Sequence, residues 1–110
     1  MIRLVYDPLK GECMPDGECV TRALLLIANH KDHNDSHVKA GKPFCVTQTF
    51  ANELFFTAFR VQVKRGLIPC EQVEVVFGDH KHIAIDKDGR CRNWPTGFCD
   101  HMEVLLEALF

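Results

Sequence analysis

The sequence lacks the patterns that mark several large functional classes. None of its 7 glycines belongs to G-x-x-x-x-G-K-[ST] or G-x-G-x-x-G, the loops whose backbone amides cradle phosphates. No apolar run approaches the roughly 20 residues that cross a bilayer. The first residues, Met1 to Tyr6, carry one charge and no cleavage-site pattern. We therefore expect a cytoplasmic protein with no nucleotide site, no cofactor and no membrane contact.

An excess of either charge is also missing. The net charge of -2 and the pI near 6.3 give no basic footprint for direct nucleic-acid binding and no acidic surface that mimics a nucleic acid. The 110 residues are 46% hydrophobic, which is enough for one domain with its own core. Because no secretion signal accompanies them, the 6 cysteines are expected to be reduced and mostly buried.

Hydrophobic periodicity and turn residues predict a single α/β domain over residues 1–110. The expected fold is a small mixed sheet of about four strands with three helices, in the order β-α-β-α-β-β-α. The first β-α-β unit favours a right-handed crossover. Polar residues 30–42 predict a flexible loop. The predicted elements are a strand Ile2–Tyr6, a helix from Asp16 to about Asn29, a strand Pro43–Gln48, a helix Phe50–Arg65 capped by Thr49, strands Val73–Phe77 and His82–Asp86, and a helix after Asp100.

The second predicted helix has more apolar residues than one buried face requires. Phe55 and Phe59 share a face with Leu54 and Ala58, whereas Phe56 lies away from it. A second buried surface, either in the core or in an interface, explains such a pattern. Aromatic side chains on an exposed patch favour partner binding. The candidate partner-binding residues are Phe55, Phe56, Phe59, Trp94 and Phe98.

Metal-ligand spacing is weak in this chain. His30, His33 and His37, with interspersed aspartates, are the best candidates, because imidazole and carboxylate suit zinc or nickel. The same run also fits a solvated polar loop, and no Cys-x-x-Cys pair accompanies it. No cysteine is singled out as a nucleophile by a neighbouring base. We therefore predict no metal and no catalytic residue.

The most specific string runs from Asp86 to Asp100 and reads DKDGRCRNWPTGFCD. It resembles the C-terminal tail of ABC/SMC-like AAA ATPases of bacterial defence operons, whose tails read approximately D-x-x-G-x-x-x-x-W-P-x-G-F-F-D. Trp94, Pro95, Gly97 and Phe98 match, as does Asp100, while Cys99 replaces the second Phe. A Trp-Pro turn that packs its ring on the core explains the same residues in structural terms.

The resemblance extends more loosely over most of the chain. Leu4 to Pro8 resembles the strand that ends in the acidic Walker B pair. Val46 to Glu53 resembles the second strand, which ends in a Thr-His-Ser motif that opens a helix. The departures matter for function: the Walker A loop is absent, Asp7 lacks the following Glu, and Phe50 stands where the switch histidine is expected. Phosphoryl transfer needs these groups, so the resemblance implies an ATPase-like lobe without catalysis.

Three functions follow as hypotheses. The first is a non-catalytic, protein-binding accessory subunit with a degenerate active site. Its partner is expected to be an ABC/SMC-like ATPase in a bacterial antiphage defence (antiviral) or toxin-antitoxin-like complex, with homo-oligomers possible. The second is a small metal-dependent hydrolase or nuclease that uses Asp7, His30, His33 or His80. The third is a phage-borne inhibitor protein.

Overall fold

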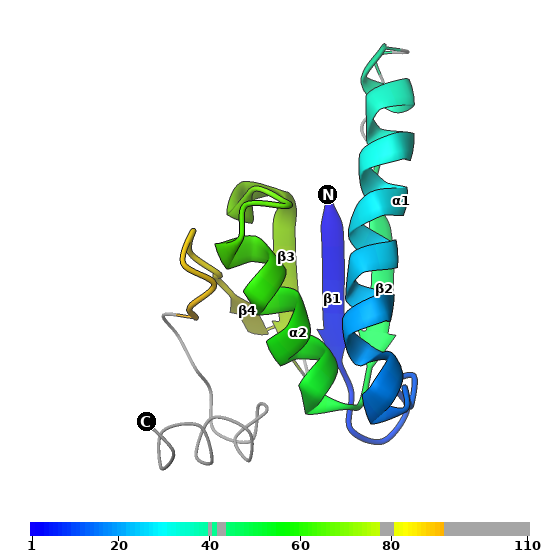
Figure 1. The fold of residues 1–110 in the computed structure, drawn as a ribbon, viewed down its shortest axis with the longest axis vertical. Helices are drawn as coiled ribbons and strands as arrows, with labels where there is room; N and C mark the ends of the chain where they lie inside the picture. Colours follow the sequence, from blue (N-terminus) through cyan, green and yellow to red (C-terminus); the bar gives the residue numbers. More distant parts are fainter. Residues whose placement is uncertain (40, 42–43, 78–80, 92–110) are drawn as a thin grey trace.

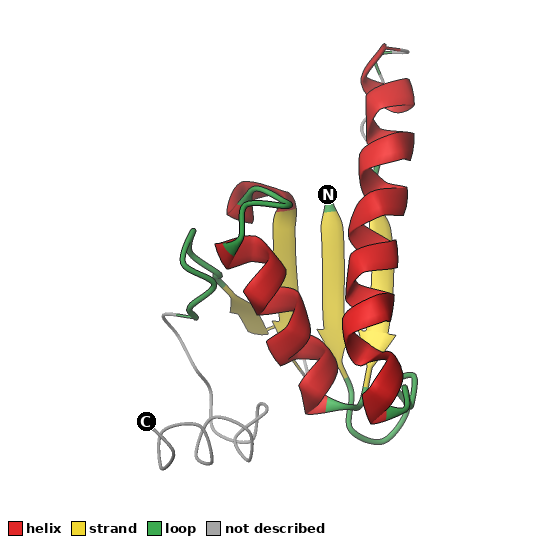
Figure 2. Cartoon of the chain, viewed as in Figure 1, coloured by secondary structure: helices red, strands yellow, loops and turns green. Residues whose placement is uncertain are grey.

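The computed structural model describes residues 1–39, 41, 44–77 and 81–91, and for residues 36–39 and 81 it describes the backbone alone. It shows an α/β fold with a four-stranded mixed sheet and two α-helices on one of its faces (Figures 1 and 2). Strands β1, β2 and β3 run parallel, and β4 pairs antiparallel with β3, in the sheet order β2-β1-β3-β4. The predicted fold class is therefore confirmed. The third predicted helix lies outside the described residues.

The observed bounds of two strands equal those predicted from the sequence, and the bounds of the other elements differ from the prediction. β1 (Ile2–Tyr6) and β3 (Val73–Phe77) have the predicted bounds. β2 spans Val46–Phe50, later than predicted, because Phe50 pairs with Tyr6 in the sheet and is fully buried. β4 is the short strand Lys81–Ile83 rather than His82–Asp86. The backbone beyond it turns at Asp86, whose Oδ1 accepts from the Asp88 and Arg90 amides.

The long helix α1, Cys19–Lys39, corrects the prediction that residues 30–42 form a flexible loop. The chain holds no glycine or proline between Gly17 and Gly41, so nothing in the backbone stops the helix after Asn29. Its first half is fixed by buried residues, among them Ala23 and Ile27. The helix α1 is about 31 Å long, whereas the strands are about 17 Å long. It therefore extends beyond the sheet (Figure 1).

The second helix, α2, spans Glu53–Lys64 and begins at Asn52 rather than at Thr49. The Asn52 Oδ1 accepts from the Leu54 amide at 3.0 Å, which is the standard N-cap arrangement. Its Nδ2 donates to the Met14 carbonyl at 2.9 Å and to Asp16 Oδ1 at 2.6 Å. Asn52 therefore joins the start of α2 to the segment that leads into α1.

The two β-α-β crossovers, one through α1 and one through α2, have opposite handedness. β1 lies between β2 and β3, so the crossover through α1 and the crossover through α2 step in opposite directions. Both helices cover the same face and pack against each other (Figure 1). Two such crossovers on one face must have opposite hands, and Figure 1 shows that β1–α1–β2 is the left-handed one. The predicted right-handed crossover is therefore wrong for the first unit.

The sheet's residue alternation explains why both helices share a face. Ile2 and Leu4 point toward the helices and are fully buried, whereas Arg3 between them is exposed. On the far face Arg3 lies beside Thr47 of β2 and Glu74 of β3. A helix packed there would bury polar side chains at a cost in free energy. The apolar core consequently has a single layer between the sheet and the helices.

Candidate protein-interaction surface

The aromatic side chains of α2 belong to the core and not to the surface. Phe55, Phe56 and Phe59 are all 0% exposed. The Phe56 ring stacks on Phe50 with centroids 5.8 Å apart, and Phe55 lies 5.4 Å from Phe50. The prediction that these three side chains contact a partner is therefore wrong for this chain. Trp94 and Phe98, the other two candidates, lie outside the described residues.

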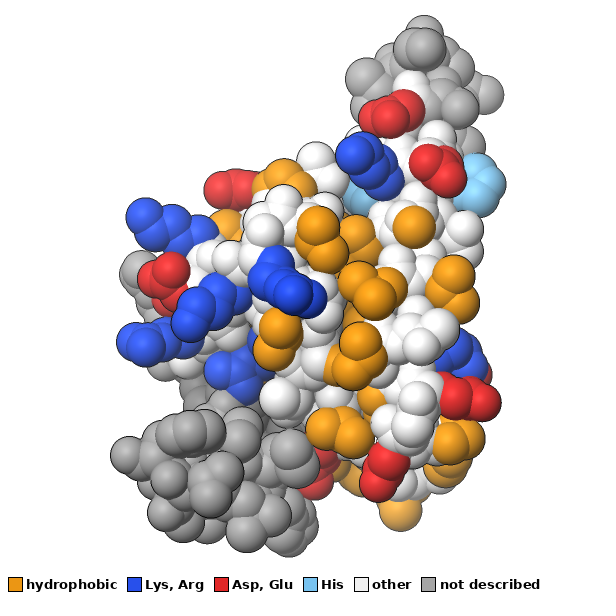
Figure 3. Space-filling model, in the orientation of Figure 1, with side chains coloured by type: hydrophobic (Ala, Val, Ile, Leu, Met, Phe, Trp, Pro, Cys, Tyr) orange, Lys and Arg blue, Asp and Glu red, His pale blue; other side chains and the backbone are white. Residues whose placement is uncertain are grey.

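Four of the seven large apolar residues that are exposed in the described part of the chain instead lie along the junction of α1 and α2. Val20, Leu24, Ile27 and Lys31 recur on one side of α1 at helical spacing. Leu54 and Val61 lie on the side of α2 opposite Arg60, which reaches to Gly89. Exposed fractions are 52% for Val20, 39% for Leu24, 46% for Val61 and 49% for Leu67. We call Val20, Leu24, Leu54, Val61 and Leu67 the interhelical strip, and Figure 3 shows apolar atoms gathered between the two helices.

The strip is electrically asymmetric along its length. Near its upper end in Figure 1, the apolar side of α1 continues into Lys31 and Asp35, and α2 ends in Lys64 and Arg65, all exposed. The Lys64 Cβ lies beside Gly89, and the three cations outnumber the one carboxylate at this end. Within the described part of the chain, no carboxylate forms an ion pair with these three cations. The lower end carries Glu18 before α1 and Glu53 in the first turn of α2. A ligand with acidic groups toward the upper end would complement this distribution.

A pocket of about 260 Å³ adjoins the upper end of the strip. Ile27, His30 and Lys31 of α1 line one wall, and Leu67 and Gln72 lie in the other. His30 is 2% exposed, and its Nε2 lies 2.8 Å from the Met1 amino nitrogen. Burial lowers the pKa of His30 below its usual value, and the neighbouring ammonium lowers it further. The buried His30 is thus part of the wall of the pocket.

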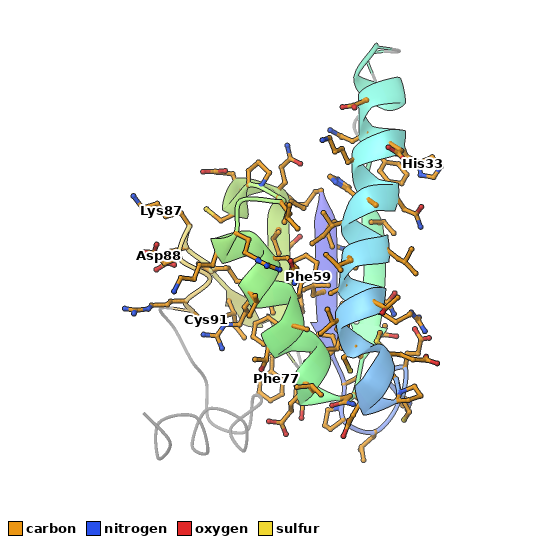
Figure 4. All side chains as sticks on the ribbon, viewed as in Figure 1. His33, Phe59, Phe77, Lys87, Asp88 and Cys91 are labelled. Carbon is orange, nitrogen blue, oxygen red and sulfur yellow. The ribbon has the colours of Figure 1, made fainter. Side chains whose placement is uncertain are left out.

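The predicted metal ligands are not brought together. The ring of the exposed His33 lies beside Phe44, and its Nδ1 is 2.9 Å from the Asn29 carbonyl, one turn back along α1 (Figure 4). His30 is buried against the start of the chain, and the side chain of His37 lies outside the described residues. Among the residues that the structure describes, no three His, Cys, Asp or Glu side chains could hold a metal ion.

The remaining candidates for chemistry have structural roles. Asp7 Oδ1 accepts from the Leu9 and Lys10 amides, both at 3.0 Å, and these hydrogen bonds lower its pKa. The carboxylate thereby fixes the turn after β1. Burial raises the pKa of the Cys19 and Cys70 thiols, the opposite of an activated nucleophile. Of the five described cysteines, all free thiols, only Cys19 is buried, so the expectation of mostly buried cysteines is wrong.

A second surface lies on the face of the sheet that the helices leave open. Glu74 of β3 accepts from Arg3 Nε at 3.1 Å and lies 2.7 Å, through its other oxygen, from His82 Nδ1 of β4. Thr47 and Thr49 of the edge strand β2 extend this polar row. Exposed ion pairs of this kind contribute little to stability. The face combines this polar row with the neighbouring Val5 and Val76, of which Val76 is buried.

No protein-family model, curated protein or solved structure matches this chain. Within the described residues, no helix combines the length and the apolar character that a membrane span requires.

Proposed function

We propose that this chain is a protein-binding module and that the interhelical strip is its contact surface. The observation that carries the proposal is the row of aliphatic side chains along two helices that pack against each other and just beyond the end of α2. Four of the five side chains are 39% to 52% exposed, and Leu54 is half-buried. Contiguous exposed apolar surface of this kind is typical of protein interaction sites. Isolated apolar residues elsewhere, such as Leu9, need no such explanation.

The chemistry of the strip specifies the kind of partner. Two packed helices offer an apolar seam that accepts the apolar face of a third helix. The cations Lys31, Lys64 and Arg65 at one end favour acidic residues at the corresponding end of that helix. The proposed partner segment is therefore an amphipathic helix with acidic residues, supplied by another protein.

The identity of the partner is a finer proposal that rests on the sequence. The similarity of residues 86–100 to ATPase tails makes an ABC/SMC-like ATPase encoded beside this chain the first protein to test. Because no Walker A loop accompanies that similarity, the proposed role is that of a non-catalytic accessory subunit in bacterial defence.

The test compares three full-length proteins for binding to that ATPase by calorimetry: the unmodified chain, Leu24→Asp with Val61→Asp, and Leu25→Asp. Leu25 is the matched control. It is 54% exposed on the same helix but points about 100° away from Leu24. We expect the double variant to weaken binding at least about 100-fold, since each buried charge opposes docking, and the control to change it less than about threefold.

Two results would contradict the proposal. If the double variant binds the ATPase as tightly as the unmodified chain, the strip is not the contact surface. If the unmodified chain is strictly monomeric and binds neither that ATPase nor any protein purified with it from the native host, the protein-binding function itself fails.

A further inference from the structure

We propose that residues 100–110 of this chain bind its own interhelical strip and compete with the partner for it. The inference rests on the proposed function, because it takes the strip to be a docking surface. It adds that the chain contains a segment with the chemistry the strip selects. Three observations support it: the pattern of that segment, the charge of the strip, and the place where the described chain ends.

The segment has the pattern of an amphipathic helix. Four of its apolar residues recur at i, i+3, i+4 and i+7, and an Asp and a Glu with capping-box spacing stand at its start. Such a helix cannot bury its apolar side alone, so it needs a surface to cover. The four residues at this spacing are Met102, Leu105, Leu106 and Leu109, the other apolar residues are Val104, Ala108 and Phe110, and the acidic residues are Asp100, Glu103 and Glu107.

The charge of the segment complements the strip. The three acidic residues are accompanied by no Lys or Arg between positions 100 and 110. Lys64 and Arg65 on α2, with Lys31 on α1, are exposed cations without an ion-pair partner among the described residues. The open face of the sheet differs, because its Arg3 is already paired with Glu74. The strip is therefore the better acceptor for an acidic, apolar segment.

The tether reaches the strip. The described chain ends at Cys91, two residues after Gly89, whose carbonyl accepts from Arg60 Nε of α2 at 2.6 Å. Gly89 has φ of 76°, and a Cβ there would lie 2.5 Å from the Arg60 carbonyl oxygen, so this turn is held close to α2. Residues 92–99 extend at most about 28 Å, whereas a helix with its side chains is only about 10 Å wide. A short tether also raises the local concentration of the segment to about the millimolar range.

The consequence is regulation by competition. An external helix binds only to the fraction of molecules in which the strip is free. If the segment covers the strip in about nine molecules of ten, it weakens the partner's apparent affinity about tenfold.

Methyl NMR of the full chain tests the proposal directly. We expect nuclear Overhauser contacts between the Leu105 or Leu109 methyls and those of Leu24 or Val61. In Leu105→Glu with Leu109→Glu, these contacts disappear and the Leu24 and Val61 methyl resonances shift, while those of Val5 on the other sheet face do not. Contacts seen only between differently labelled copies in a mixed sample would overturn the proposal in favour of a second copy, and the absence of contacts would overturn it altogether.

A charge swap separates specific docking from a general loss of structure. Lys64→Glu with Arg65→Glu should weaken the contacts, and adding Glu103→Lys with Glu107→Lys should restore them. Failure of the second pair to restore any contact would contradict the proposed charge pairing. If the unmodified chain binds the ATPase but shows no intramolecular contacts, only this inference is contradicted. If it shows the contacts but binds no partner, only the proposed function is contradicted.

Discussion

Replacing Phe59 by alanine is the sharpest test of how α2 divides between core and surface. Phe59 is 0% exposed and its ring centroid lies 6.3 Å from that of Phe55, within the layer between the helices and the sheet. Removing a fully buried phenylalanine ring deletes its transfer free energy and leaves a cavity. Together these effects cost about 3–5 kcal/mol. A domain of this size is stable by about 5–15 kcal/mol, so the variant should lose about a fifth of its stability or more.

Urea unfolding followed by circular dichroism measures the effect. With a slope of about 1–3 kcal/mol per molar urea, the midpoint should fall by about 2 M. Val61→Ala is the matched control on the same helix: its side chain is 46% exposed, and the midpoint should move by the equivalent of less than about 0.5 kcal/mol. If Phe59→Ala keeps the midpoint and lowers only partner binding, the aromatic face belongs to an interface and our assignment of the core is refuted.

Two further predictions concern local contacts. Asn52→Ala should lower the free energy of unfolding by about 1–2 kcal/mol, because it removes the cap of α2 together with the bonds to Met14 and Asp16; an unchanged thermal midpoint would show that the cap is dispensable. His30 has a lowered pKa in the folded state, so the unfolded chain binds the proton more readily. Stability should be fully present above about pH 6.5 and fall as the pH drops below it. His30→Gln should flatten this slope between about pH 7.5 and about pH 5.5, and an identical slope in both proteins would argue against the buried histidine.

The types of most elements could be predicted because helices and strands differ in the local spacing of their apolar residues. Val73–Phe77 is a compact β-branched run between a Pro-containing turn and a glycine, and its bounds agree with the structure. Asn52 was missed as a helix cap because Thr49 offers the same chemistry three residues earlier. The decisive difference is that Phe50 pairs with Tyr6 across the sheet, a contact between residues far apart in the chain.

The candidate surface could not be read from the sequence for a related reason. Phe56 and Val61 are both apolar residues of α2, yet one is fully buried and the other is half exposed. Periodicity shows that the helix has an apolar excess, but it does not show which residues the neighbouring elements cover. The aromatic residues attracted the prediction because they have the largest apolar area, and the same area is what drives them into the core.

The sequence by itself determined that this chain forms an α/β sheet with one apolar face, because Ile2 and Leu4 alternate with Arg3 along β1. Only the tertiary structure decided that both helices share that apolar face, which makes the first crossover left-handed. It also decided that Leu24 and Val61, rather than the phenylalanines, remain exposed. The physical reason is that burial depends on which elements meet, and α1 and α2 meet through contacts that no local pattern records.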